Sequence, residues 1–462
     1  MGGNRHPDGV RADAADATQL ASFEQAERAL ERFTAPVLLD EDKPEQRLFV
    51  ASFDGTGNSK RDAAKFTNIA LMDEQVRSYA RAAEDRLGYV PVHAGYVAGP
   101  GTQGGISGMI DAAYGGSYEA RVEDMYLQFV SQAKIWLDEN PGADIRILAT
   151  GFSRGAEQAA GFTRLVEARG IQNSTDAVVK RDADGLIVGQ VIYPRPPLRE
   201  PGTVIQAAAL FDPVGTGAPR QNDRRLAESV VSAFQITAMS ERRNLFQGTW
   251  ITDFGATSDG RFLNVGVAGA HSDIGGGYRR DGLGILAGNL GVDYVNSMIR
   301  PPPLEKRALP DDPDRYVVHR SEEHLAIYGT SVFDKAGARG MQDLLAPPSL
   351  CQIDCRDAMP RNEAMAAALE WQRVGIGPVR GSVPGRDAGL ETSAFASDLL
   401  SAAAREDGHA ISERLREQLA SDAGQTWLQQ GFDALERQSR EFAAHGGAHG
   451  PAPVHQADGP AL

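Results

Sequence analysis

Apolar and polar residues follow two periods along the chain, most clearly between residues 47 and 300. Short apolar runs of strand length, such as RLFVASF at 47–53 and DIRILAT at 144–150, alternate with longer segments that have apolar residues at helical spacing, such as 66–87. This alternation is typical of a parallel sheet with helices on both faces, joined by right-handed crossovers. We therefore predict a doubly wound, mostly parallel α/β domain over residues 47–300.

The segments on either side of this domain have a different texture. Residues 1–46 are polar and alanine-rich, and they contain one helical pattern. A proline-rich break opens residues 301–445, which we expect to be a linker followed by a mainly helical extension. The composition of residues 446–462 is typical of a disordered tail.

Three smaller elements are also predicted. The apolar residues of 225–239 and of 361–374 have spacings that indicate helices. Residues 177–194 read as a hairpin that turns at Asp184 and Gly185 and interrupts the domain.

A five-residue motif, Gly-Phe-Ser-Arg-Gly, carries the first candidate chemistry. The strand at 144–150 precedes it, and an alanine-rich helical segment follows. A nucleophile elbow needs this order of strand, tight turn and helix, with glycine-sized flanks that let neighbouring backbones approach. We predict that Ser153 is a nucleophile between Gly151 and Gly155, which makes the domain α/β-hydrolase-like; the alternative is an ordinary strand-to-helix turn.

An acid and a histidine follow in the order that this fold requires. Asp212 comes directly after the apolar run 203–211, and His271 comes just after another, at 262–269. Each of the two intervals, from Ser153 to Asp212 and from Asp212 to His271, is 59 residues and has room for a strand and a crossover. The three residues therefore form a candidate catalytic triad.

Nearby acids and histidines fit other roles. We expect Asp273 to shape its loop by bonding the backbone amides of the glycines that follow it. We expect His319, which follows the proline-rich break, to have a surface or structural role.

Acyl transfer also needs backbone N–H groups where negative charge develops on the carbonyl oxygen. We expect one from Arg154, the residue after the nucleophile, and another from Gly55 or Thr56 in the DGTGN turn after the first strand. A plain turn is the alternative for DGTGN. The GPGTQG run at 99–104 lacks the context of a dinucleotide fingerprint, and we interpret it as a loop at the rim of the site.

Charge and composition narrow the function classes. The net charge of −15 argues against nucleic acid as a partner. No segment has the roughly 20 apolar residues of a membrane span, and the N-terminus lacks a signal peptide's apolar run. No structural zinc site is expected, because the two cysteines, Cys351 and Cys355, lack neighbouring ligands. No metal or cofactor is expected in the reaction, because a serine triad requires neither.

Five motifs together, SFDGTGN, AGPGTQGG, TGFSRGA, LFDPVGT and GAHSDIGGGY, resemble the α/β-hydrolase domain of antibacterial phospholipase effectors of type VI secretion. The resemblance covers roughly residues 47–299 and implies that Ser153, Asp212 and His271 are the triad. It also implies glycerophospholipids in a membrane surface as substrates, a secretion spike or tube protein as carrier, and a cognate immunity protein. Such a protein is made in the bacterial cytoplasm and secreted into a target cell without a cleaved signal peptide.

Two other functions fit the same sequence. An esterase or thioesterase that acts on soluble esters would use the same triad. A non-catalytic scaffold on a hydrolase fold would instead use the helical extension as its working part.

Overall fold

The computed structural model describes residues 8–59, 66–102, 115–323, 339–342, 344–351 and 362–379. By internal contacts the chain divides into two compact units, residues 1–382 and 383–462, and the described residues all belong to the first. The helix expected before residue 445, the tail at 446–462 and residues 103–104 of the GPGTQG run lie outside the described residues. The expected boundaries at residues 46 and 300 stay predictions.

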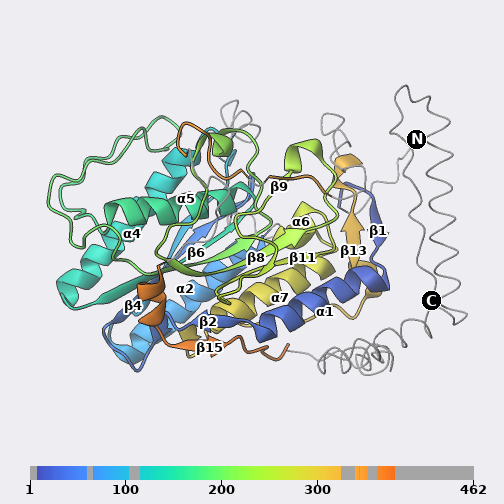
Figure 1. Cartoon of the computed structure of the whole chain (residues 1–462), viewed down its shortest axis with the longest axis horizontal. Helices are drawn as coiled ribbons and strands as arrows, with labels where there is room; N and C mark the ends of the chain where they lie inside the picture. The colour runs from blue at the N-terminus through green and yellow to red at the C-terminus, as the bar shows by residue number, and fades with distance from the viewer. Residues whose placement is uncertain are drawn as a thin grey trace, which may run out of the picture. The chain divides into compact units, whose positions relative to one another are not determined.

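The centre of the first unit is a seven-stranded, mostly parallel sheet (Figure 1). From edge to edge its strands are β10 (Gly255–Ala256), β11 (Phe262–Val267), β8 (Val230–Ala238), β7 (Gln206–Phe211), β6 (Asp144–Phe152), β4 (Gln46–Phe53) and β5 (Val92–Val97). Only β10 runs antiparallel to its neighbour. The chain passes from β4 to β5 on one side and then returns to β6 on the other. The carboxyl ends of β4 and β6 therefore form the switch point where α/β sheets bind ligands.

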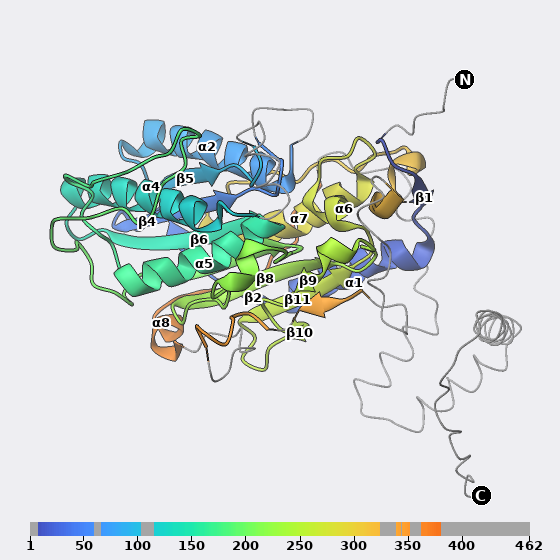
Figure 2. The same ribbon diagram turned by 90° about the horizontal axis from the view of Figure 1, so that it is seen from above.

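Helices cover both faces of the sheet, as the alternating pattern predicted. One face carries α1 (Ala17–Arg32), α2 (Asn68–Leu87) and α7 (Gly282–Asn296), and the other carries α4 (Tyr118–Glu139) and α5 (Arg154–Arg169). Figure 2 shows α2 and α5 on opposite sides of strands β4 and β6. Alternate residues of β4 enter the two hydrophobic cores, because successive strand side chains point to opposite faces.

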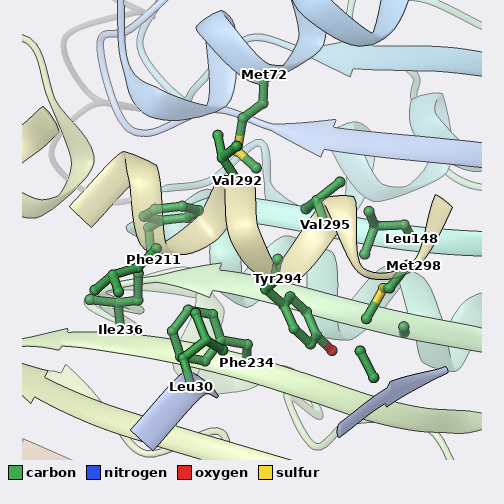
Figure 3. Packing of buried hydrophobic residues seen from close by; sticks show 14 of the residues in the cluster. Leu30, Met72, Leu148, Phe211, Phe234, Ile236, Val292, Tyr294, Val295 and Met298 are labelled. Atoms are coloured by element: carbon green, nitrogen blue, oxygen red, sulfur yellow. The ribbon is translucent and has the colours of Figure 1, made fainter. Parts of the chain in front are cut away.

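The helix α7 is the centre of the first of these cores (Figure 3). Its Val292 packs toward Met72 of α2, while Tyr294 lies beside Phe234 of strand β8, with ring centroids 5.4 Å apart. The hydroxyl of Tyr294 is buried and bonds Ser232 at 2.9 Å. This packing fixes α7 on the sheet directly after the short helix α6 (His271–Gly275), which carries the candidate histidine.

Short strands tie the first 46 residues to segments beyond residue 298. Three pairs do so: β1 (Ala12–Ala14) with β13 (Val317–His319), β3 (Leu39–Asp40) with β12 (Ile299–Arg300), and β2 (Thr34–Pro36) with β15 (Trp371–Arg373). A fourth pair joins β9 (Gly248–Thr249) to β14 (Met341–Gln342). The described parts of both flanking segments therefore pack on the sheet domain.

One predicted helix is wrong and a second is too long. Residues 225–239 contain strand β8, which is buried on both faces; a continuous apolar strand of this kind does not alternate, so periodicity does not distinguish it from a buried helix. Within 361–374 the helix α8 spans only Glu363–Ala367 and strand β15 follows. The hairpin at 177–194 is present as two isolated antiparallel bridges around Gly185. Among the described helices, none combines the length and hydropathy that a membrane span needs.

Candidate active site

The turn between β6 and α5 holds Ser153 in a backbone conformation that L-residues rarely adopt. Ser153 has φ 61° and ψ −129°, and its N–H donates to Phe211 O at 3.0 Å on the neighbouring strand. A Cβ on Gly151 would lie 2.4 Å from Gly155 O, and a Cβ on Gly155 would lie 2.3 Å from Phe53 O. Both positions therefore require glycine, and the strained serine is in the geometry of a nucleophile elbow.

The loop after β4 lies against this turn. The N–H of Gly55 donates to the carboxylate of Asp54 at 2.7 Å, so that group is already occupied. The N–H of Thr56 has no acceptor among the described residues. Of the two expected oxyanion donors, the geometry favours Thr56.

The side chain of Arg154 connects the loops that follow three different strands. Its Nη1 donates to Thr56 Oγ1 at 2.8 Å, and its Nε donates to Thr216 O at 3.2 Å in the loop after β7. The side chain is almost completely buried. Arg154 thus holds the Thr56 loop close to the serine turn, a role that the sequence motif did not disclose.

Asp212 and His271, although 59 residues apart, meet in a buried hydrogen bond. Asp212 Oδ2 lies 2.6 Å from His271 Nδ1, and Asp212 Oδ1 accepts the N–H of Ala238 at 2.9 Å. The strands preceding Ser153 and Asp212 are neighbours, with Phe152 opposite Phe211. All three candidate residues therefore lie at the carboxyl ends of parallel strands, and all three are buried.

Two aromatic rings flank the imidazole of His271. The ring of Phe152, the residue before the serine, has its centroid 4.5 Å from that of His271, and the ring of Phe246 lies 5.1 Å away. A Cβ on Gly275 would overlap the Phe152 ring at 2.0 Å, which shows how closely α6 approaches the serine turn. The described residues show no hydrogen bond between Ser153 Oγ and the imidazole, and such bonds are often long before substrate binds.

Charged groups that the sequence analysis missed surround the Asp212–His271 pair. Arg339 donates to Asp212 Oδ1 at 2.6 Å and to Oδ2 at 3.1 Å, and its side chain is fully buried. Glu241 accepts the backbone N–H of His271 at 3.1 Å and pairs with Arg243. No motif marks these residues, since Arg339 lies 127 residues beyond Asp212 and Glu241 lies in an irregular loop.

The surroundings set the protonation states of the site. Burial acts to raise the pKa of Asp212, but the Arg339 charge and the bond from His271 outweigh it and hold this pKa below its ordinary value. Burial also lowers the pKa of His271, although the bond to Asp212 opposes it. The resting site therefore has an ionised Asp212 and a neutral imidazole, which is the state of a general base.

Asp273 and His319 belong to a separate buried cluster that secures α6. Asp273 accepts the N–H of Ala270 at 2.8 Å, and it bonds the backbone and the ring of His319. The other ring nitrogen of His319 lies 3.0 Å from Asp8. Asp273 shapes its loop as expected, but it does so through Ala270 and His319 and not through the glycines that follow it.

A family model supports the resemblance seen in the motifs. Residues 47–182 match the model described as "T6SS, Phospholipase effector Tle1-like, catalytic domain". Ser153, Arg154 and the Thr56 loop lie inside the matched segment, whereas Asp212 and His271 lie beyond it. No curated protein matches the chain significantly.

Two solved structures align loosely with the chain. An uncharacterized protein from Pseudomonas aeruginosa aligns with 16% identity over 68% of this chain and 54% of that chain, at a TM-score of 0.34. The Tle1 effector bound to the VgrG spike of the type 6 secretion system aligns with 21% identity over 50% of this chain and 51% of that chain, at a TM-score of 0.28. The chain thus spans about half the length of each.

The site described above rests on the chain's own geometry, since both alignments are too loose to transfer residue positions. The match to the family model confirms the resemblance without help from the two structural alignments. Over residues 47–182 this chain is similar to the Tle1-like catalytic domain of type VI secretion phospholipase effectors.

Proposed function

We propose that the protein is a serine hydrolase that cleaves acyl esters of glycerophospholipids, with Ser153, His271 and Asp212 as its triad. The observation that carries this proposal is the buried Asp212–His271 hydrogen bond beside a serine on a strained, glycine-flanked turn. The family match supplies the substrate class, because its description names phospholipase effectors.

In the proposed reaction Ser153 Oγ attacks the ester carbonyl carbon while His271 Nε2 takes the hydroxyl proton. The tetrahedral intermediate collapses, and the imidazolium gives that proton to the leaving alcohol. Water then attacks the acyl-enzyme by the same route and releases the fatty acid. Asp212 orients the imidazole through Nδ1 and stabilises its charged form.

The proposed oxyanion hole combines backbone groups from two loops. Arg154 occupies the first position of α5, where N–H groups point out of the helix end toward developing negative charge. The N–H of Thr56 is the second donor, and the Arg154 side chain holds its loop in place. Of the two donors expected from the sequence, Gly55 and Thr56, the proposal therefore takes Thr56.

We extend the proposal to delivery, from the family match alone. As a type VI secretion effector, the protein would travel with a spike or tube protein and would be neutralised in its producer by an immunity protein. Phospholipase A-type cleavage, releasing one fatty acid from the glycerol backbone, is the activity expected in the target cell.

The test compares wild type with Ser153→Ala. Phosphatidylglycerol and phosphatidylethanolamine vesicles and p-nitrophenyl butyrate serve as substrates, and a fluorophosphonate serves as an active-site probe. Wild type is expected to release fatty acid from vesicles and to be labelled, and Ser153→Ala is expected to do neither. Hydrolysis of the soluble ester alone would contradict the phospholipase, and equal labelling of both proteins would contradict the serine nucleophile.

A further inference from the structure

All three guanidinium nitrogens of Arg339 form hydrogen bonds in the site, although this residue comes from the segment beyond residue 300. Its Nη1 donates to Asp212 Oδ1 and to Ala238 O, each at 2.6 Å. Its Nη2 donates to Asp212 Oδ2 at 3.1 Å and to Phe246 O at 2.7 Å, and its Nε also faces Phe246 O. Ala238 and Phe246 flank the loop 239–245. One guanidinium therefore binds both ends of this loop and the Asp212 carboxylate.

The closed loop acts on the histidine as well. It contains Glu241, whose carboxylate accepts the backbone N–H of His271, and it leads into Phe246, whose ring lies against the imidazole. A single side chain thus fixes the acid directly and the histidine through two contacts of the loop.

We propose that Arg339 is a positioning residue for the Ser153 reaction, which holds the Asp212 carboxylate in the ionised state and the orientation that His271 requires. This inference rests on the proposed triad. It assigns to the segment beyond residue 300 a part in the chemistry, outside the region of the family match. The planar fork of arginine suits the task, since it meets both carboxylate oxygens and both carbonyls at once.

The charges around the pair predict how Arg339 affects proton binding. The pair faces Arg339 from the segment beyond residue 300 and Glu241 and Arg243 from the loop 239–245. With Arg339 present, its positive charge balances the negative charge of Asp212. The carboxylate then stabilises the protonated form of His271 only weakly. Without Arg339, an unbalanced buried carboxylate favours proton uptake by the Asp212–His271 pair, so the pair binds a proton at a higher pH.

The experiment measures kcat/KM for p-nitrophenyl butyrate as a function of pH in the full chain. Arg339→Gln is expected to move the acidic limb of the profile upward by about one pH unit or more. It is also expected to lower kcat at the optimum by up to roughly a hundredfold, since the acid is misplaced. Arg339→Lys keeps the charge but not the fork, and it is expected to lower kcat with the acidic limb close to that of wild type.

Arg146 offers a matched control. Its guanidinium is also almost buried, donates to two backbone carbonyls, Val37 O and Leu38 O, and pairs with one carboxylate, Asp144. It lies at the start of β6, at the opposite end of that strand from Ser153. Arg146→Gln is expected to lower stability and to leave the pH profile unchanged.

A second readout separates this inference from the proposed function. The NMR titration of His271 in histidine-labelled protein is expected to show an upward shift in Arg339→Gln even if no substrate is cleaved. Arg339→Gln should lower kcat by a far smaller factor in the Asp212→Asn background than in wild type, because both residues act through the same carboxylate.

An unchanged acidic limb and an unchanged His271 titration in Arg339→Gln would overturn the proposal, as would an equal shift in Arg146→Gln. Should Arg339→Gln fail to fold, a wild-type kcat in Arg339→Lys would overturn it. A wild type that neither cleaves ester nor reacts with fluorophosphonate would refute the triad, while the His271 titration would still test the role of Arg339.

Discussion

The closest backbone approach at the serine turn leads to a quantitative prediction for Gly155→Ala. A Cβ at this position would lie 2.3 Å from Phe53 O and 2.5 Å from Asp54 O. Both atoms are backbone, so neither can rotate away. To restore van der Waals contact, β4 and the start of α5 must separate by about 1 Å.

This separation is expected to slow the reaction, because β4 and α5 position different groups of the candidate site. The Thr56 loop follows β4, and Ser153 precedes α5. A misplacement of about 1 Å between nucleophile and oxyanion donor costs roughly a hundredfold in rate. Overpacking is also expected to lower the free energy of unfolding by about 1–3 kcal/mol.

Gly95→Ala is the matched control for overpacking. Its added Cβ would lie 2.5 Å from the Phe49 ring and 2.8 Å from Met125 Sδ, within β5 and away from the turn. Both variants should lose stability in urea titrations, but only Gly155→Ala should lose kcat/KM for p-nitrophenyl butyrate. A wild-type kcat/KM in folded Gly155→Ala would refute the reasoning, and so would an equal loss in Gly95→Ala.

Three further predictions follow from contacts in the site and beside it. Thr56→Val removes the hydroxyl that accepts from Arg154, and it should lower kcat by about tenfold, because a buried donor loses its acceptor; a wild-type kcat would contradict the loop's role. Asp212→Asn should lower kcat by about 10⁴-fold, since an amide does not hold the required tautomer of the base, and retention of a tenth of the activity would exclude Asp212 as the acid. Burial opposes charge on His319, but its bonds to two buried aspartates outweigh this and raise its pKa. The resulting stability is fully present below pH about 6.5 and lost as pH rises through the raised pKa, so the melting temperature should fall over that interval in wild type but not in His319→Asn.

The sequence predicted the parts of the site that lie at strand ends. Asp212 directly follows an apolar run, Ser153 and His271 come within three residues of the end of one, and parallel strands bring such positions to one edge of a sheet. The order of the three residues along the chain, and their place at strand ends, could therefore be predicted from the sequence alone. Gly151 and Gly155 could also be predicted, since a nucleophile elbow requires small residues two positions before and after the serine.

The contacts that the sequence did not predict depend on irregular segments. Arg339 reaches Asp212 from a segment with no strand or helix pattern of its own, and an arginine there resembles any solvated arginine. The choice between Gly55 and Thr56 depends on one side chain, Asp54, that turns back on its own loop. Such local bonds follow from the folded backbone and leave no periodic signal in the sequence.

The strand pairs between the first 46 residues and the segments beyond residue 298 also have a consequence in time. Thr34–Pro36 pair with Trp371–Arg373, so the partner strand of β2 is synthesised about 335 residues after β2 itself. At ribosomal rates of roughly 5–20 residues per second, this interval lasts about 15–70 s. During synthesis β2 therefore stays without its partner strand after Ser153, Asp212 and His271 have been made, and it joins the domain only once Trp371–Arg373 have left the ribosome.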